Sequence, residues 1–299
     1  MGKSAVALEL ARRVDGEIVS ADSMQVYRGM DIGTAKPSAQ ERAAVRHHLI
    51  DVCDADAVFD VKQFVDLAKK TVRDIHARGK QALVVGGTGL YVRALRQGLF
   101  EGPTRDPALR AKLELMSAAT LFEELRRVDP KTAGQIDKKN PRRLVRALEV
   151  FYLTGKPVSE LQTQWEGIPP PGGPAICLDR NRDDLYERIE RRIDEQIAAG
   201  WVEEVQRLLQ RGMGGNPTAM QAAGYRELAA HLQGGPALEE TVRLIKARTR
   251  QLARRQLTWF RREAGLNWLE IGRAETPQET AGRALEIFER ERTGHVEDA

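Results

Sequence analysis

Two glycine-containing segments of this sequence carry residue types that bind phosphate groups. The first, Gly2-Lys3-Ser4, matches the end of the phosphate-binding motif G-x-x-x-x-G-K-[ST]. Backbone N–H groups at a helix start attract anions, Lys3 adds a positive charge, and the Ser4 hydroxyl can ligate Mg²⁺. The second is Gly86-Gly87-Thr88-Gly89, where glycine permits close approach of a ligand and Thr88 offers a hydroxyl group. Each segment alone also fits an ordinary helix start or turn.

A carboxylate follows the first apolar strand-like run of the chain. Asp22 comes directly after 18–21, and ligands of open α/β sheets bind beyond the carboxyl ends of the strands. Asp22 is therefore expected beside the phosphate groups. There it could bind Mg²⁺, or it could accept a proton from an amine nucleophile. Capping of a turn or helix is the structural alternative.

Alternating helices and strands are expected to position these segments. Apolar residues recur at helical spacing over 4–14 and 57–78, and short apolar runs predict buried strands over 18–21 and 81–85. This order predicts an α/β fold with a parallel, doubly wound sheet flanked by helices. Further expectations are a strand over 175–178 that returns to this sheet, an edge strand over 267–271, and helices over 201–211, 218–232 and 237–263.

The middle of the chain predicts an all-helical insertion. No strand-like run appears between 102 and 171, whereas Asp106-Pro107 and Asn140-Pro141 each pair a cap with proline at the first helical position. Helices are expected from Pro107 and over 121–128 and 140–153. We predict a helical domain over 104–172, which ends in the proline- and glycine-rich segment 169–174. The core domain would comprise 1–103 and 173–299.

Arginines cluster on two of the expected helices. Three follow the cap at Asn140, namely Arg142, Arg143 and Arg146, with apolar residues on another face. The segment 248–262 holds six arginines and no acidic residue. Its Leu252, Gln256 and Trp259 share a face that should pack on the core. Such cationic surfaces suit RNA phosphates, but they are also typical of solvated helix faces.

The segment Gln221-Ala222-Ala223-Gly224-Tyr225-Arg226 combines small residues with an aromatic ring and a cation. Single-stranded RNA is commonly recognised by aromatic and guanidinium planes on which bases stack. Tight helix packing through the small residues is the alternative, and both roles are compatible.

Composition indicates a globular protein of the cytoplasm. The 299 residues are 41% hydrophobic and 30% charged, with a net charge of +4, which is only weakly suggestive of an anionic partner. Cys53 and Cys177 lie in apolar runs and are expected as reduced thiols, and no cysteine or histidine spacing resembles a zinc site. No apolar run approaches the roughly 20 residues that span a bilayer, so no membrane partner is expected. We expect a monomer.

Five motifs in order resemble the tRNA dimethylallyltransferase family. They are DSMQVYRGMDIGTAKP at 22–37, VGGTGLY at 85–91, NPRRLVRALEVF at 140–151, QAAGYRE at 221–227 and RQLARRQLTWFRR at 250–262. The resemblance spans nearly the whole chain. It implies a P-loop NTPase-like, nucleotide-binding type of core. It also implies transfer of a dimethylallyl group from dimethylallyl diphosphate to N6 of the adenosine immediately 3′ of the anticodon, with Mg²⁺.

The resemblance also implies roles for individual residues. Asp22 would be the general base, and Thr88 and Arg110 would act on the substrates. The donor diphosphate would lie on Gly2, Lys3 and Ser4, with Ser4 on Mg²⁺. The anticodon stem-loop would contact Asp22, Ser23, Met24, Gln25, Arg142, Arg143, Leu144, Val145, Arg146, Gln221, Ala222, Ala223, Gly224, Tyr225 and Arg226.

Three other functions remain open from the residues alone. An NTP-dependent small-molecule kinase would use the same phosphate loop with ATP and need no RNA. An adenylate prenyltransferase would use a free nucleotide as acceptor. A catalytically impaired RNA-binding fragment would keep only the arginine surfaces.

The phosphate-binding motif is incomplete at the start of this chain. The strand that normally precedes it, the first glycine and three loop positions are absent before Met1. We therefore expect weak donor binding and a groove where the first strand belongs.

Overall fold

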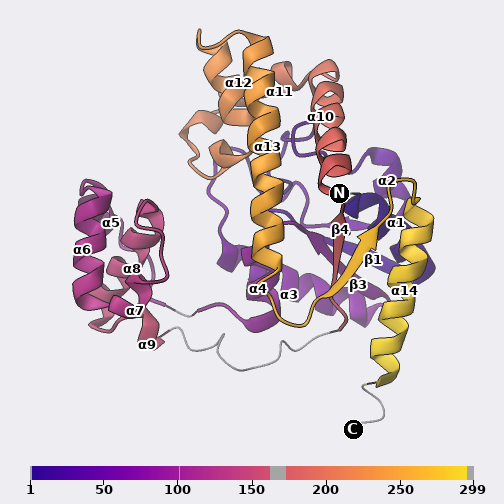
Figure 1. Ribbon diagram of the computed structural model, residues 1–299, viewed down its shortest axis with the longest axis horizontal. Coiled ribbons are helices and arrows are strands. Elements are labelled where there is room, and N and C mark those ends of the chain that lie inside the picture. The colour runs from indigo at the N-terminus through magenta and orange to yellow at the C-terminus, as the bar shows by residue number, and fades with distance from the viewer. Residues whose placement is uncertain (1, 101, 162–172, 295–299) are drawn as a thin grey trace. The chain divides into compact units, whose positions relative to one another are not determined.

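The computed structural model describes residues 2–100, 102–161 and 173–294, with side chains up to Glu291. The chain divides into two compact units, one of residues 1–96 and 169–299 and the other of residues 97–168. We call them the core unit and the helical unit (Figure 1). The predicted domain boundaries were 104 and 172, of which 172 lies outside the described residues.

The core unit contains two parallel sheets. In the first, β1 (Gly16–Ala21) lies between β2 (His47–His48) and β3 (Gln81–Gly86). Ala21 pairs with Gly86, so β1 and β3 end side by side. In the second, β4 (Ile176–Arg180) pairs with β5 (Asn267–Ile271). The parallel α/β fold and the strands predicted near 18–21, 81–85 and 267–271 are confirmed.

The strand predicted over 175–178 does not join the first sheet. Among the described strands, β4 pairs only with β5, and β3 pairs only with β1. Neighbouring strands lie about 4.8 Å apart along their hydrogen bonds, and β3 and β4 share no such ladder. The prediction was wrong here because an apolar run identifies a strand but not the strand with which it pairs.

The helices of the core unit are α1 (Lys3–Arg13), α2 (Ala39–Ala44), α3 (Val61–Ala77), α4 (Gly89–Gln97), α10 (Arg182–Ala198), α11 (Trp201–Gln210), α12 (Tyr225–Leu232), α13 (Leu238–Phe260) and α14 (Pro277–Gly294). Helix α3 starts four residues later than predicted because Asp60 and Gln63 form a capping box. Helix α12 starts at Tyr225, not at 218, because Gly224 has a φ of 92° and interrupts the helix. Helix α14 was not predicted, and it packs beside α1 (Figure 1).

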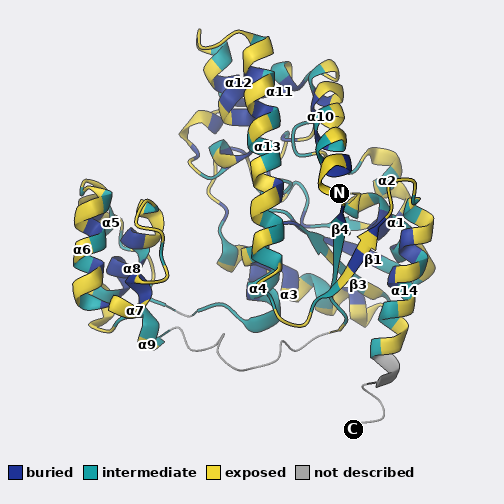
Figure 2. Ribbon diagram, in the orientation of Figure 1, coloured by how far each residue is buried: buried dark blue, intermediate teal, exposed yellow. Residues whose placement is uncertain are grey.

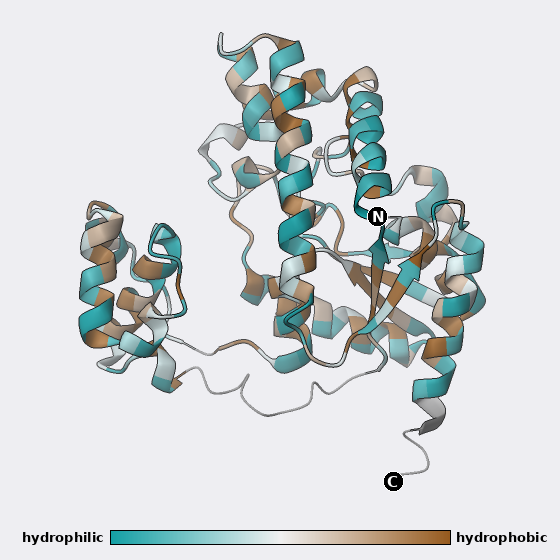
Figure 3. Ribbon diagram, in the orientation of Figure 1, coloured by the Kyte–Doolittle hydropathy of each residue, from teal (hydrophilic) through white to brown (hydrophobic). Residues whose placement is uncertain are grey.

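The residues of β1 are more deeply buried than those of β3. Five of the six residues of β1 are buried, and Figure 2 colours the elements by burial. Ile18 packs with Ala7 and Ala11 of α1 and with Val45. Strand β3 has no buried residue, and Val84 is 39% exposed. Helix α13 differs from the buried strand β1, because it is mostly hydrophilic along its length (Figure 3). Asp22 therefore follows the best-buried strand of the core unit.

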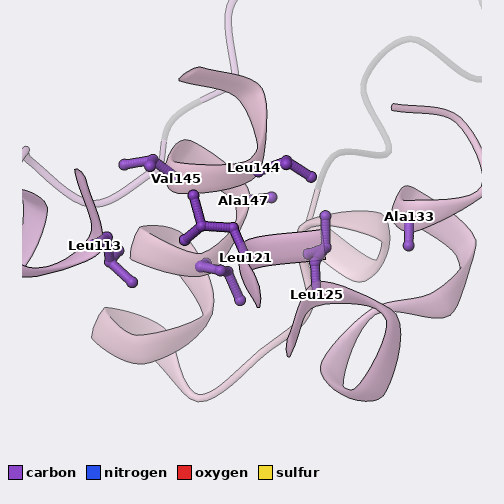
Figure 4. Packing of buried hydrophobic residues seen from close by; sticks show 8 residues of the cluster. Leu113, Leu121, Leu125, Ala133, Leu144, Val145 and Ala147 are labelled. Atoms are coloured by element: carbon purple, nitrogen blue, oxygen red, sulfur yellow. The ribbon is translucent and has the colours of Figure 1, made fainter. Parts of the chain in front are cut away.

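The helical unit contains α5 (Pro107–Glu114), α6 (Ala118–Val128), α7 (Pro130–Ala133), α8 (Pro141–Thr154) and α9 (Val158–Leu161). Asp106 caps α5 and Asn140 caps α8 through their side-chain oxygens, as the Asp-Pro and Asn-Pro pairs predicted. The core of the unit holds eight buried residues, Leu113, Leu121, Leu125, Ala133, Leu144, Val145, Ala147 and Leu148 (Figure 4). The predicted helices of this segment are confirmed.

Within the described residues, no helix is both long and apolar enough to cross a membrane. Cys53 and Cys177 are free thiols, as expected. Burial raises the pKa of the Cys177 thiol to about 11, so this sulfur stays protonated near neutral pH.

Candidate active site

One pocket of the core unit lies at the carboxyl ends of β1 and β3, where α1 begins. Its lining residues come from segments far apart in the chain: Lys3, Ser4, Asp22, Gln25, Thr34, Ala35, Val85, Gly86, Gly87 and Arg192. The pocket thus brings together Lys3, Ser4 and Asp22, which the sequence had assigned to phosphate binding and proton transfer. Thr88 is not part of its lining.

Helix α1 begins at the phosphate-loop residues themselves. Lys3 is its first residue, and Gly2 before it is left-handed, with a φ of 79° and no side chain that could cap the helix. The first N–H groups of α1 are therefore available to an anion. Burial lowers the pKa of the Lys3 amine, and the charge of Asp22 opposes this shift. A cation and a carboxylate thus act on each other in one pocket.

The two oxygens of Asp22 have different surroundings. Oδ1 accepts hydrogen bonds from the backbone N–H groups of Met24 at 2.9 Å and Gln25 at 3.4 Å. Oδ2 accepts no hydrogen bond from any described residue, and the half-buried side chain lines the pocket. The capping alternative is therefore right for Oδ1. Oδ2 is open to accept a proton or ligate a cation.

Thr88 supports the turn that carries Asp22. Its Oγ1 accepts a hydrogen bond from the N–H of Ser23 at 3.0 Å and lies 3.3 Å from the Ser23 hydroxyl. The N–H of Thr88 donates to the carbonyl of Ala21 at 3.3 Å. In this structure the Thr88 hydroxyl therefore fastens the 86–89 loop to the end of β1. Its predicted contact with a diphosphate stays a prediction.

Helix α10 brings a guanidinium group to the pocket that the sequence analysis did not assign. Arg192 lines the pocket and remains exposed, and it forms no ion pair or hydrogen bond with other described residues. The nearby opposite charge that acts on it is Asp22. The apolar spacing of Leu185, Ile189 and Ile193 is typical of a helix, but it does not show which sheet edge the helix crosses. Arg192 could therefore not be found from a local pattern.

A second pocket lies at the amino ends of β1 and β3. Its lining is rich in charge and includes Arg12, Asp15, Glu17, Arg46 and Lys80. Lys80 pairs with Asp15 at 2.7 Å, and buried Glu17 accepts hydrogen bonds from His48 and Arg78. Burial alone would raise the pKa of Glu17, but these hydrogen bonds outweigh it and lower the pKa. Paired charges at the amino ends of the strands indicate a structural network, not the reaction site.

The segment 221–226 is divided between buried and exposed side chains. Tyr225 is fully buried, packs edge-on against Trp201 and donates its hydroxyl hydrogen to Glu204 at 2.6 Å. Burial and the Glu204 carboxylate raise the pKa of Tyr225, so the hydroxyl keeps its proton. The expectation that this ring stacks on a base is wrong for this structure, because the tight-packing alternative buries it. Gln221 and Arg226 are exposed and remain candidates for RNA contact.

Comparison with known proteins shows the family to which this chain belongs. Residues 25–263 match the family described as IPP transferase. The chain belongs to the IPP transferase family. The resemblance drawn from the five sequence motifs is thereby confirmed.

Several relatives of this IPP transferase are similar over most of their length. The chain is 49% identical over 277 residues to the tRNA dimethylallyltransferase of Geobacter metallireducens, covering 90% of this chain and 89% of that protein. It is 38% identical to the crystal structure of the full-length tRNA isopentenylpyrophosphate transferase of Bacillus halodurans, with a TM-score of 0.70, covering 98% and 95% of the two chains. A eukaryotic dimethylallyltransferase acting on tRNA is 26% identical, with a TM-score of 0.82, covering 95% and 75%.

The helical unit of this IPP transferase gathers two arginines around one buried carboxylate. Glu149 is fully buried and accepts hydrogen bonds from Arg146 at 2.8 Å and from the backbone N–H of Asp106 at 3.2 Å. The guanidinium of Arg110 lies 4.0 Å from the same carboxylate. Glu149 therefore holds together two arginines to which the resemblance gave different roles, Arg110 on the substrates and Arg146 on tRNA.

The other residues of α8 that were predicted to contact tRNA lie partly on the surface and partly in the core of the helical unit. Arg142 and Arg143 are exposed and form no ion pair with other described residues. Leu144 and Val145 are buried in the core of the helical unit (Figure 4). Their side chains therefore do not lie on an RNA-binding surface here. That Arg142, Arg143 and Arg146 contact tRNA stays a prediction.

Helix α13 of the IPP transferase rests on the 86–89 loop. The Gln256 amide donates to the carbonyl of Gly87 at 3.0 Å. A Cβ atom on Gly89 would lie 2.4 Å from the Trp259 ring, so only glycine allows this approach. The face predicted to pack on the core is confirmed for Gln256 and Trp259. It is wrong for Leu252, which is 37% exposed.

Proposed function

We propose that this protein transfers a dimethylallyl group from dimethylallyl diphosphate to N6 of the adenosine immediately 3′ of the anticodon in tRNA. The observation that carries the proposal is that Lys3 and Ser4, at the start of α1, line the same pocket as Asp22. An anion site and a carboxylate base are thus in one place. The 49% identity to a relative named tRNA dimethylallyltransferase supports the choice of substrates.

In the proposed reaction, the amine of an unstacked adenine attacks the allylic carbon while the bond from that carbon to the diphosphate oxygen breaks. The amine is a poor nucleophile because its lone pair is delocalised into the ring. Oδ2 of Asp22 accepts the amine proton as the carbon–nitrogen bond forms. The diphosphate leaves with the negative charge, which the start of α1, Lys3 and Arg192 neutralise. For Arg110, the family resemblance alone suggests a role on the substrates.

Mg²⁺ fits the donor groups of this pocket. The Ser4 hydroxyl is an oxygen donor, and Mg²⁺ is commonly bound by one or two protein oxygens together with substrate phosphates. Within the described chain, no three His, Cys, Asp or Glu side chains converge on a metal site. Ser4 would hold the ion, which when bound would neutralise charge on the leaving group.

The test of the proposal is the fate of labelled donor. The protein is incubated with labelled dimethylallyl diphosphate, Mg²⁺ and either unmodified tRNA or AMP, and ATP turnover is followed in parallel. We expect label in tRNA and none in AMP. Label in AMP alone would favour an adenylate prenyltransferase, and ATP turnover without RNA would favour a small-molecule kinase.

The exposed arginines of α8 give a prediction about RNA affinity. Replacing Arg142 and Arg143 together with alanine is expected to weaken binding of all tRNAs alike. Removal of one arginine–phosphate interaction should reduce the slope of log K against log salt by about 0.7–0.9. Filter binding over a salt series measures this slope. The matched control is Arg127→Ala, an exposed arginine of the same unit that is paired with Glu124 at 2.7 Å. Equal slopes for both variants would refute the proposed interaction with RNA.

A further inference from the structure

A loop next to the pocket is fastened by one buried carboxylate of α11. Glu204 is 2% exposed, and its Oε2 accepts hydrogen bonds from the backbone N–H groups of Asp31 at 2.9 Å and Ile32 at 2.7 Å. Its Oε1 accepts from the N–H of Gly33 at 3.3 Å and from the Tyr225 hydroxyl at 2.6 Å. No described lysine or arginine forms an ion pair with it. Four neutral donors therefore stabilise this buried charge.

Two further side chains hold the same loop against α10 and α11. The Gln196 amide donates to the carbonyl of Ile32 at 2.6 Å and lies 3.3 Å from that of Gly33. A Cβ atom on Gly33 would lie 2.1 Å from Nε1 of Trp201, so the backbone rests directly on this ring. The N–H groups of 31–33 and the carbonyls of Ile32 and Gly33 are thus bound by side chains of α10 and α11.

The fastened loop leads directly to Asp22. The carbonyls of Thr34 and Ala35, which line the pocket, accept hydrogen bonds from the Gln25 side-chain amide at 3.2 and 3.3 Å. The Gln25 amide oxygen accepts from the Ser20 hydroxyl at 3.0 Å, and its backbone N–H lies 3.4 Å from Oδ1 of Asp22. A hydrogen-bonded path therefore joins Glu204 to Asp22 through the 31–35 loop and Gln25.

We infer that Glu204 is a positioning residue, which acts through the 31–35 loop and Gln25 to set the orientation of the Asp22 carboxylate. This inference rests on the proposed role of Asp22 as the base. Glu204 is not among the residues that line the pocket. Its effect on the rate should therefore pass entirely through Asp22.

The variant Glu204→Gln keeps the size of the side chain but replaces one carboxylate oxygen with an NH₂ group. The two N–H or O–H donors that this oxygen served then lose their acceptor. Amide hydrogens of 31–35 should then exchange about tenfold faster or more, as measured by mass spectrometry of the free protein. The turnover number should fall by up to about 10²-fold, because small misplacement of a reacting group has effects of that size. The matched control is Asp129→Asn, a buried carboxylate of the helical unit that likewise accepts backbone N–H hydrogen bonds, from Thr132 and Ser159, and which should change neither quantity.

The double variant Asp22→Asn with Glu204→Gln separates positioning from general damage. If Glu204 acts through Asp22, the double variant should be no slower than Asp22→Asn alone. The inference would be overturned if the losses in turnover of the two single variants multiply in the double variant. It would also be overturned if the amide hydrogens of 31–35 in Glu204→Gln exchange as slowly as in the unsubstituted protein. If the unsubstituted protein transfers no prenyl group to tRNA, the proposed function fails. Hydrogen exchange then still decides whether Glu204 fastens the loop.

Discussion

Replacing Asp22 with alanine is expected to lower the turnover number about 10²–10⁴-fold, which is the usual contribution of a general base. Binding of tRNA should change far less, because removing a single side chain that touches RNA costs about 1–3 kcal/mol. Single-turnover rates and tRNA binding, measured on the same preparation, test both parts. Asp22 stands at the end of the best-buried strand with one oxygen open to the pocket, and this placement is the physical reason for the size of the effect.

The variant Asp22→Asn distinguishes the base from the cap. An asparagine oxygen can still accept the hydrogen bonds of Met24 and Gln25 that Oδ1 accepts now, but an amide cannot take up a proton near neutral pH. The two variants should therefore be similarly slow. An Asn variant within about tenfold of the unsubstituted protein would mean that Asp22 only shapes the turn.

Replacing Gly86 with alanine is expected to damage both stability and turnover. A Cβ atom there would lie 2.0 Å from the carbonyl oxygen of Ala21, its partner on β1, and backbone atoms cannot move aside as a side chain can. Overpacking of this kind costs about 1–3 kcal/mol or more. Each kcal/mol lowers the melting temperature of a domain of 150–250 residues by about 2–4 °C. Because Asp22 follows Ala21, the displaced strand should also slow turnover, by up to about 10²-fold.

The control for this variant is Gly215→Ala. No heavy atom lies within 4 Å of a Cβ atom built at Gly215, and its backbone is not left-handed. Calorimetry and single-turnover assays on both variants make the comparison. A Gly86→Ala protein with the melting temperature and rate of the Gly215→Ala protein would show that β1 and β3 separate easily.

Local signals predicted most of the elements that position the site. Strands β1 and β3 were visible as apolar runs, and the caps at Asp106 and Asn140 were visible as cap–proline pairs. The start of α1 at Lys3 followed from the phosphate-loop residues. These features depend on residues within one turn or one strand of each other, so the sequence alone contains them.

Contacts between distant segments could not be predicted in the same way. Glu204 and Asp31 are 173 positions apart, and Gln256 and Gly87 are 169 apart. The two-residue strand His47–His48 exists only because it pairs with Ile18 and Val19 of β1. Arg192 likewise reaches the pocket only through the course of α10 past the sheet. Each of these depends on tertiary packing, which hydrophobic periodicity does not specify.

The most direct test of the central claim is the position of the product on RNA. An unmodified tRNA with adenosine immediately 3′ of its anticodon is incubated with the protein, dimethylallyl diphosphate and Mg²⁺, then digested and analysed by mass spectrometry. A matched tRNA with guanosine at that position is the control. We predict one dimethylallyl group on the anticodon-loop fragment of the first tRNA and none on the second. Equal modification of both tRNAs, or modification outside the anticodon loop, would contradict the account.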